Sequence, residues 1–312
     1  MANRADFSLW VEKYRPQKID HAILPNEYRK FFKKIVKTGD IPNLLLYSSS
    51  PGTGKTTIAK ALCIEAGVDY LYINASKDTG IDILRTTITK YASGKSLSGK
   101  KKVVILDEVD GSSATSFQAA LRAFIEEFHN SCRFILTCNY VNKIISPLRS
   151  RCQEFDFNVT TKELRNELVP KITQRLEKIL NTEEVTYSDG VISKLADQLF
   201  PDIRKMLSML QQFSTISGHV DENIFKYESV DEEFYEFILN KQFTKARQFV
   251  IDSGYNLDEL YTALYRNLVP RLDKKVQGQA VMSIAEWQYR SAFSADKEIP
   301  FAAMLLEIIN LE

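Results

Sequence analysis

The stretch Ser49-Ser50-Pro51-Gly52-Thr53-Gly54-Lys55-Thr56-Thr57 has the composition of a loop that grips phosphate, and it decides how the chain around it can fold. Glycines in this stretch let the backbone turn tightly, so that its N–H groups point at phosphate oxygens. Lys55 is expected to reach the β- and γ-phosphates, and the Thr56 hydroxyl is expected to bind Mg²⁺. The sequence therefore predicts a nucleotide site that includes Ser50, Pro51, Gly52, Thr53, Gly54, Lys55, Thr56 and Thr57.

Ser49 departs from the usual spacing G-x-x-x-x-G-K-[ST], because it stands where the first glycine is expected. Serine is tolerated at this position if its φ is negative. By itself, a Gly-Lys-Thr sequence could belong to an ordinary surface loop. The flanking sequence favours a nucleotide site, since an apolar run over 41–47 predicts a buried strand before the loop and 58–62 predicts a helix after it.

The composition sets broad limits on the protein. A length of 312 residues predicts two or three domains, and 44% hydrophobic residues are enough for buried cores. No apolar run approaches the roughly 18 residues that span a membrane, so we expect a soluble, cytoplasmic protein without a membrane partner. The net charge of +1 excludes bulk electrostatic adhesion to nucleic acid and leaves DNA binding to a few placed residues. The four cysteines lack C-x-x-C spacing, which disfavours zinc and a disulfide framework.

Short apolar runs alternate with helical patterns through the first half of the chain. Strands are predicted at 41–47, 70–74, 103–106, 133–137 and 154–157, and helices at 27–38, 58–62, 78–92 and 116–128. This alternation predicts an α/β fold with a doubly wound parallel sheet, whose ligands lie at the carboxyl ends of the strands. We assign residues 1–158 to this nucleotide-binding domain.

The strand signal stops after Phe157. Leucine or isoleucine recurs every fourth residue from Leu164 to Leu180, which predicts an amphipathic helix with a kink at Pro170. Further helices are predicted at 190–199 and 203–216, which gives a small helical domain over 159–226. The pattern remains helical over 227–312 and contains no catalytic constellation, so a helical assembly module is expected there.

Polar residues at strand ends are the candidates for chemistry. Asp107 and Glu108 follow an apolar strand, so one carboxylate can hold Mg²⁺ while the other polarises an attacking water. Paired acids at a strand end can also be merely solvated. Asn139 closes the fourth strand, where an amide could position that water. Arg151 precedes the fifth strand and Arg204 begins a helix of the second domain, and either could be an ordinary surface arginine.

Together these residues resemble the AAA+ ATPases, and more narrowly the clamp-loader subunits, which include the replication factor C small subunits and their phage counterparts. Ser150-Arg151-Cys152 is the most specific match, because it separates clamp loaders from most other AAA+ proteins. The Ser49 departure and the length are most similar to the T-even-type phage members. The matching segments, which span roughly the first two thirds of the chain, are 11–16, 49–57, 74–76, 80–82, 107–110, 118–122, 134–139 and 150–152.

The resemblance implies ATP and Mg²⁺ as cofactors and a role for each matching residue. Asp107 and Thr56 bind Mg²⁺, Lys55 binds phosphate, Glu108 is the catalytic base and Asn139 is the first sensor. Arg204 is the second sensor in the lid, and Arg151 is the arginine finger, which reaches the nucleotide of the neighbouring subunit. The pocket-lining segment corresponds to Glu12, Tyr14 and Arg15, and the relay to the subunit interface corresponds to Gln118 and Arg122.

The resemblance also implies macromolecular partners: a sliding clamp, primer–template DNA, and a pentamer of four copies with one companion subunit, held by a C-terminal collar. Candidate DNA phosphate contacts are Lys77, Thr79, Arg85, Ser112 and Ser113, although each could be merely solvated. The segment of Tyr91, Ala92 and Leu97 matches a tip that docks on the clamp, where we expect an exposed aromatic side chain to fill a groove.

The leading interpretation is an ATP-driven switch that opens a ring-shaped clamp, places it on primer–template DNA and releases it on hydrolysis. A hexameric AAA+ helicase or translocase would share the ATP site, but it would usually carry extra pore-loop or β-hairpin elements, which we do not find in the sequence. A scaffold with a dead nucleotide site is disfavoured, because Lys55, Asp107, Glu108 and Arg151 are all present. The bacterial motor subunit is disfavoured by the missing cysteine spacing.

Overall fold

The computed structural model describes residues 9–76, 84–94, 96, 99–159, 161–227, 232–253 and 255–311. The chain divides into two compact units, Met1–Asp221 and Glu222–Glu312. The first unit holds the expected nucleotide-binding domain and nearly all of the expected lid. The boundary of the second unit falls a few residues before the predicted start of the collar at residue 227. The division of the first unit at residue 158 stays a prediction.

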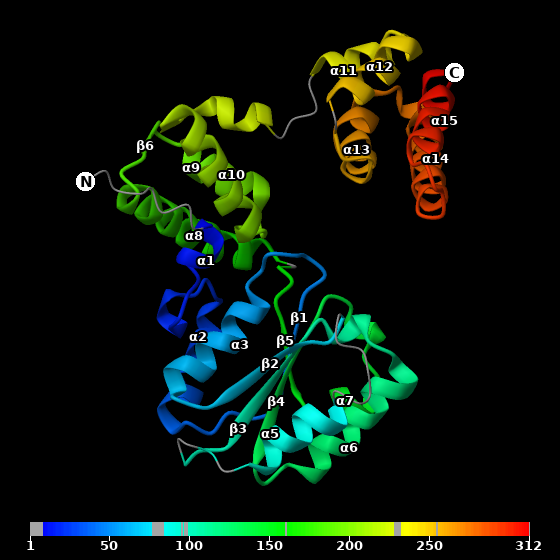
Figure 1. Cartoon of the computed structure of the whole chain (residues 1–312). Helices are drawn as coiled ribbons and strands as arrows, with labels where there is room; N and C mark the ends of the chain where they lie inside the picture. The colour runs from blue at the N-terminus through cyan, green and yellow to red at the C-terminus, as the bar shows by residue number, and fades with distance from the viewer. Residues whose placement is uncertain are drawn as a thin grey trace, which may run out of the picture. The chain divides into compact units, whose positions relative to one another are not determined.

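A parallel sheet of five strands forms the centre of the first unit (Figure 1). Its strand order is β2-β3-β4-β1-β5. Neighbouring strands place Asn74 beside Asp107 and Leu46 beside Thr137, so the carboxyl ends of these strands meet at one edge of the sheet. The α/β fold with a five-stranded parallel sheet is confirmed. The strands are β1 (Leu44–Tyr47), β2 (Tyr70–Asn74), β3 (Lys102–Asp107), β4 (Cys132–Cys138) and β5 (Gln153–Asp156).

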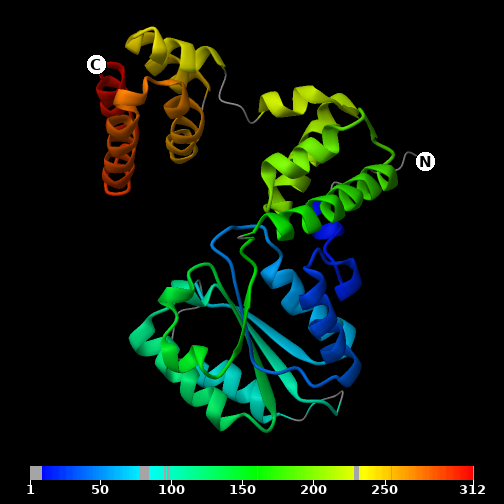
Figure 2. The same cartoon turned by 180° about the vertical axis from the view of Figure 1, so that it is seen from behind.

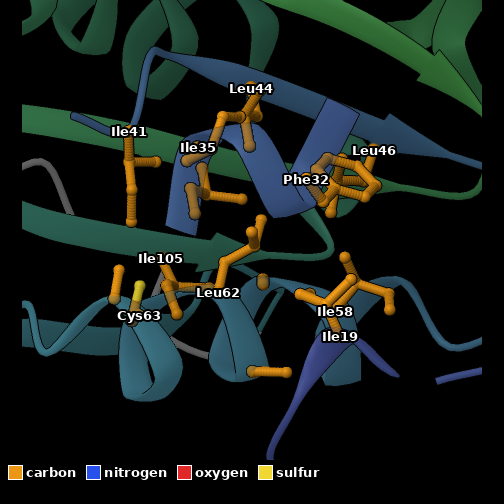
Figure 3. Close-up of a cluster of buried hydrophobic side chains, with 14 of the residues drawn as sticks. Ile19, Phe32, Ile35, Ile41, Leu44, Leu46, Ile58, Leu62, Cys63 and Ile105 are labelled. Atoms are coloured by element: carbon orange, nitrogen blue, oxygen red, sulfur yellow. The ribbon is translucent and has the colours of Figure 1, made fainter. Parts of the chain in front are cut away.

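Helices cover both faces of this sheet, which explains why its central strands are apolar along their whole length (Figures 1 and 2). On β3, the side chain of Ile105 packs in the cluster with α2 (Asn26–Thr38) and α3 (Lys55–Ala66), as Figure 3 shows. The next residue, Leu106, packs in the opposite cluster with α6 (Ala119–Glu127). Alternation along the strand therefore supplies two cores, one for each face.

Shorter helical segments complete the layer around the sheet. Helix α1 (Trp10–Lys13) precedes α2, α5 (Thr89–Ser93) follows a π-helical turn at Leu84–Ile88, and α6 follows a π-helical turn at Ala114–Gln118. Helix α7 (Ser146–Arg149) leads into β5. The start of the helix expected from residue 78 lies outside the described residues.

The last part of the first unit is helical, as the apolar spacing predicts. Helix α8 (Lys162–Thr182) contains Pro170, and α9 (Val191–Leu199) and α10 (Ile203–Ser217) follow it. The structure corrects one expectation, because β6 (Thr186–Tyr187) and β7 (His219–Val220) form a small parallel pair in this region. Strands of two residues are too short to show an alternating pattern in a sequence.

The second unit is a bundle of helices around its own core. Phe234, Tyr261 and Phe301 are among its fully buried side chains. Its helices are α11 (Glu232–Leu239), α12 (Phe243–Ser253), α13 (Leu257–Ala263), α14 (Lys274–Ser291) and α15 (Glu298–Ile309). Among the described residues of both units, no helix combines the length and the apolar character needed to cross a membrane.

Candidate nucleotide-binding site

The predicted phosphate loop joins β1 to α3 and has the backbone that its glycines allow. Gly52 and Gly54 have φ values of +68° and +92°, in the left-handed region that favours glycine. Lys55 begins α3, and its buried Nζ donates to the carbonyl oxygens of Ser48 at 3.1 Å and Ser50 at 3.2 Å. Burial lowers the pKa of the Lys55 ammonium. Burial disfavours the charged form of the ammonium, and the negative charge of a phosphate group beside it would favour that form again.

Ser49 satisfies the condition for a residue at the first glycine position, since it is not among the residues with positive φ. The side chain of Asn158, which follows β5, holds it in place. Oδ1 of Asn158 accepts hydrogen bonds from the Ser49 backbone N at 2.9 Å and the Ser49 hydroxyl at 2.8 Å. Asn158 was not predicted from the sequence, because its partner lies more than a hundred positions away and no local pattern signals the contact.

Asp107 ends β3 at the carboxyl edge of the sheet, where three hydroxyl groups converge on its buried carboxylate. Oδ1 accepts from the hydroxyls of Thr56, at 2.7 Å, and of Thr137. Oδ2 accepts from the hydroxyl of Tyr72 at 2.8 Å. Burial and the bond to Asp107 raise the pKa of Tyr72 to about 12. The carboxylate and the Thr56 hydroxyl are oxygen donors of the kind that Mg²⁺ prefers, so these residues fit the expected metal. Sequence reasoning missed Tyr72 and Thr137.

Glu108 follows Asp107 and is exposed, with a left-handed φ of +59°. Its backbone N–H donates to the Thr137 hydroxyl at 3.1 Å. Its carboxylate accepts from the Ser76 hydroxyl at 2.7 Å. A positive φ is costly for a residue other than glycine and is found where the surrounding structure enforces it. The backbone thus turns sharply at Glu108, next to the carboxylate that fits the metal.

Asn139 directly follows the neighbouring strand β4, and a carboxylate holds its backbone. Oδ2 of Asp110 accepts from the backbone N–H groups of Asn139 at 3.1 Å and Tyr140 at 3.0 Å. The acidic stretch after β3 thereby fixes the turn after β4. Asn139, Asp107 and Glu108 all line the cavity that opens above the phosphate loop.

This cavity brings together most of the residues predicted from the sequence. It has an apolar part that suits a nucleobase, which includes Val11, Pro16, Ile23, Ile203 and Leu207. The polar residues that line it are Tyr14, Arg15, Thr53, Lys55, Thr56, Thr57, Asp107, Glu108, Thr137, Asn139, Arg175 and Arg204, together with Pro51, Gly52 and Gly54 of the loop. Two of the residues predicted to bind the nucleotide do not line it: Ser50 contributes its carbonyl to Lys55, and Glu12 forms an ion pair with Arg15.

The N-terminal segment is tied to the lid part of the same unit. The Tyr14 hydroxyl donates to Glu183, and Nζ of Lys13 lies 2.9 Å from the same carboxylate. Arg175 donates to the Tyr14 carbonyl at 2.6 Å. The Trp10 backbone N–H donates to Gln211 at 2.9 Å. These contacts join the N-terminal segment to α8 and α10, and two of the residues that make them, Tyr14 and Arg175, line the cavity.

The predicted relay residue Gln118 is fully buried between two segments of the chain. Its Nε2 donates to the Lys143 carbonyl at 3.1 Å, and its Oε1 accepts from the Ile145 N–H at 2.9 Å. Arg151 does not line the cavity of its own chain. Its Nε donates to Glu126 at 2.9 Å, and Arg122 lies 4.0 Å from the same carboxylate.

The residues predicted to contact DNA and the clamp are only partly supported. Lys77, Thr79 and Leu97 lie outside the described residues, as does the side chain of Arg85. Ser113 is exposed, as a DNA contact must be. Ser112 is buried instead, and its hydroxyl donates to the Val109 carbonyl at 2.6 Å. At the expected clamp-docking tip, Ala92 is fully buried and Tyr91 is partly buried against the core under α6, so the structure does not provide the expected exposed aromatic there.

Comparison with known proteins identifies the family. Residues 45–163 match the "ATPase family associated with various cellular activities (AAA)". The "Sliding-clamp-loader large subunit" of Escherichia phage RB69 is 34% identical over 284 residues, which cover 88% of this chain and 86% of the relative. The chain belongs to the clamp-loader family of AAA+ ATPases. The "Replication factor C small subunit" of Methanoculleus marisnigri is 31% identical over an alignment of 320 positions, which covers 97% of this chain and 96% of the relative.

Membership of the clamp-loader family confirms the resemblance found in the sequence, and it makes the chain an ATPase. Among solved structures, the RuvB Holliday junction branch migration motor of Thermotoga maritima superposes with a TM-score of 0.57 over 80% of this chain and 85% of its own. At 16% identity this likeness concerns the AAA+ fold alone. The cavity described above is therefore the candidate nucleotide site of this ATPase.

Proposed function

We propose that this chain is a motor subunit of a sliding-clamp loader in DNA replication. It binds ATP, assembles with other subunits to open the ring-shaped clamp, places the clamp on primer–template DNA and releases it when ATP is hydrolysed. A cavity that brings together most of the predicted ATP-site residues, in a chain that matches a sliding-clamp-loader large subunit over 88% of its length, carries this proposal. Because DNA is the substrate, the proposed location is the cytoplasm, of a host cell if the protein is viral.

The cavity residues divide into binding and reaction roles. Lys55 neutralises phosphate charge, and the loop N–H groups add their dipoles. Thr56 and Asp107 would hold Mg²⁺, which supplies a Lewis acid for phosphoryl transfer when bound. Glu108 accepts a proton from the attacking water, which Asn139 helps to position. Arg204 extends from the lid into the same cavity, where it senses whether nucleotide is present.

Arg151 acts on the nucleotide of a neighbouring subunit. Its position outside its own cavity supports this role, as does its side chain, which is 32% exposed. To reach a neighbouring subunit, the guanidinium must leave the Glu126 carboxylate and bind phosphate oxygens instead. Carboxylate and phosphate groups both offer the paired oxygen acceptors that arginine prefers. Each site is then completed only in the assembly, for which we propose four copies and one companion subunit.

DNA and clamp contacts are distributed over the assembly. With a net charge of +1, one chain offers few phosphate contacts, and several chains must align theirs along the duplex backbone. Ser113 and Arg85, with Lys77 and Thr79, are the residues that we propose for the DNA side.

A clamp-retention assay tests the proposal. The assembled complex is incubated with labelled clamp and primed circular DNA, and the clamp that stays on the DNA is counted after gel filtration in high salt. We expect retained clamp with ATP and none with ADP. A different result would indicate a hexameric motor: the complex moves DNA strands, retains no clamp on the DNA, and contains six chains by native mass spectrometry.

A further inference from the structure

Tyr72 occupies a position at the nucleotide site that the proposed roles do not use. It lies on β2, at one edge of the sheet, and its hydroxyl donates to Oδ2 of Asp107 at 2.8 Å. Thr56 and Thr137 donate to the other carboxylate oxygen, Oδ1. Within the described part of the chain, Tyr72 alone donates to Oδ2, so it fixes the half of the carboxylate that the two threonines leave free.

The ring of Tyr72 is itself held from one side. Nζ of Lys60 lies 4.0 Å from the ring centroid, close enough for a cation–π interaction. Lys60 lies one helical turn after Thr56 on α3, so the two side chains project from the same face of that helix. One face of α3 therefore supplies both a direct donor to Asp107 and the cation that supports the Tyr72 ring.

The orientation of an aspartate carboxylate is loosely determined by its own side chain, because rotation about its last bond has broad minima. A hydroxyl donor on each oxygen removes this freedom. Hydrogen bonds to an ionised group are also stronger than those between neutral groups. The arrangement at Asp107 is thus suited to present its carboxylate in one orientation.

We propose that Tyr72 is a positioning residue, which holds the Asp107 carboxylate in the orientation that receives magnesium, and that Lys60 holds the Tyr72 ring in place for this task. The proposal rests on the proposed function, in which Asp107 belongs to the metal site. Tyr72 acts through Asp107, so its removal affects the metal-dependent part of nucleotide binding and leaves the part due to Lys55 unchanged.

Tyr72→Phe removes the hydroxyl and keeps the ring under Lys60. Tyr70→Phe is a matched control, because Tyr70 lies two residues earlier on the same face of β2 and is 36% exposed against 37% for Tyr72, whereas the bond to Asp107 is made by Tyr72. Binding of a fluorescent ATP analogue to the full chain is measured in EDTA and across a Mg²⁺ titration. Binding of Mn²⁺ in the presence of ADP, followed by electron paramagnetic resonance, is measured independently of any turnover.

For Tyr72→Phe we expect unchanged affinity in EDTA and a Mg²⁺ midpoint raised about 10-fold, the usual lower bound for losing a residue that orients a metal ligand. Mn²⁺ binding should weaken in parallel. Tyr70→Phe should match the wild type. A second variant, Lys60→Met, keeps the hydroxyl but removes the cation from the ring, and a smaller shift in the same direction is expected.

Coincident Mg²⁺ curves for wild type and Tyr72→Phe, or an equal shift in Tyr70→Phe, would overturn the inference and leave the proposed function intact. If the nucleotide affinity of the wild-type protein does not depend on Mg²⁺, the proposed metal site is wrong, and this inference is wrong with it. Thermal unfolding of each variant shows whether it is folded. If Tyr72→Phe does not fold, Lys60→Met decides, and an unchanged Mg²⁺ midpoint there counts against the proposal.

Discussion

Lys55 and Glu108 line the same cavity but have opposite surroundings, which suits different moments of the ATPase cycle. Lys55 is buried, and its ammonium is bound to loop carbonyls that a phosphate can replace. Glu108 is exposed, and its carboxylate holds the Ser76 hydroxyl at 2.7 Å. This difference fits the proposed roles, in which Lys55 binds phosphate in the ground state and Glu108 acts on water during the reaction.

Substitution of these two residues should separate binding from hydrolysis. Lys55→Ala is expected to abolish ATP binding, whereas Glu108→Gln should keep wild-type affinity and lose on the order of 10² to 10⁴-fold in turnover, the range typical of a general base. Equilibrium binding of a fluorescent ATP analogue and steady-state ATPase assays measure the two effects. Equal ATP affinity in Lys55→Ala and wild type would refute the assigned role of Lys55.

The phosphate loop and the lid lie close together at Gly52. A Cβ at this position would lie 1.8 Å from Oδ1 of Asp202 and 3.2 Å from its Cα. Asp202 also caps α10, because Oδ1 accepts from the Lys205 N–H at 3.0 Å. Because Gly52 has no side chain, the phosphate loop can pack directly against Asp202, although the two are far apart in the sequence. This contact links the conformation of the loop to the start of α10, the helix that carries Arg204.

Gly52→Ala and Gly54→Ala form a matched pair that measures this approach. Both positions have positive φ, so either alanine should cost about 1–2 kcal/mol of unfolding free energy. Gly52→Ala should cost more, because it also displaces Asp202, whereas a Cβ at Gly54 meets nothing within 4 Å. Denaturant unfolding of the nucleotide-free protein measures the difference. If the two variants are equally stable, or if adding Asp202→Ala leaves the gap unchanged, the close packing is not significant for stability.

The same elements show how far sequence patterns determine the fold and the site. Strand β2 was predicted with its observed bounds, since periodicity is a local property. Strand β1 begins at Leu44 rather than Ile41, which is consistent with Pro42, whose missing N–H cannot join a ladder. Tyr72, Thr137 and Asn158 were missed, because their contacts join separate elements. The strand order was not predicted either, because it depends on contacts between strands that are far apart in the sequence. The burial of Ser112 was missed for a related reason, since a serine beside an acidic strand end carries no signal of its internal bond.

The whole chain is suited to act as one member of an assembly. All the predicted ATPase residues except Arg151 lie in or against the cavity of their own chain. Arg151 is held at the surface by Glu126 and the Pro147 carbonyl. The net charge of +1 likewise gives a single chain little attraction for DNA. Hydrolysis and DNA binding are therefore both expected to depend on neighbouring subunits.

Arg151→Ala should bind nucleotide normally and lose on the order of 10³-fold or more in turnover within the assembly, as expected for an arginine finger supplied in trans. Arg149→Ala is the control, because Arg149 lies on the same segment but is paired with Glu154 at 2.9 Å. It should keep most of the activity. ATPase assays on fully assembled complexes, with assembly verified by native mass spectrometry, give the comparison. An assembled Arg151→Ala complex with the wild-type rate would exclude the finger.

DNA binding should appear only in the ATP-bound assembly and should not depend on base sequence, because backbone contacts position a protein without specifying bases. If six to ten phosphate contacts align, affinity should fall by about 10³ to 10⁵-fold between 50 and 200 mM salt. Arg85→Ala should flatten this salt dependence and leave basal ATPase intact. Fluorescence anisotropy with primed DNA of two unrelated sequences measures the salt dependence and the sequence dependence of DNA binding. Tight binding by the isolated chain without nucleotide, or a strong sequence preference, would contradict distributed backbone contacts.

ATP hydrolysis by the assembled complex, measured alone, with primed DNA, with clamp, and with both together, tests most directly whether this ATPase loads clamps. In the proposed function, clamp and primed DNA are both ligands of the same ATP-bound state, so full stimulation should require the two together. We expect a small increase with either ligand and the full rate only with both. Full stimulation by DNA in the absence of clamp would contradict clamp loading and would assign the ATPase to a DNA motor.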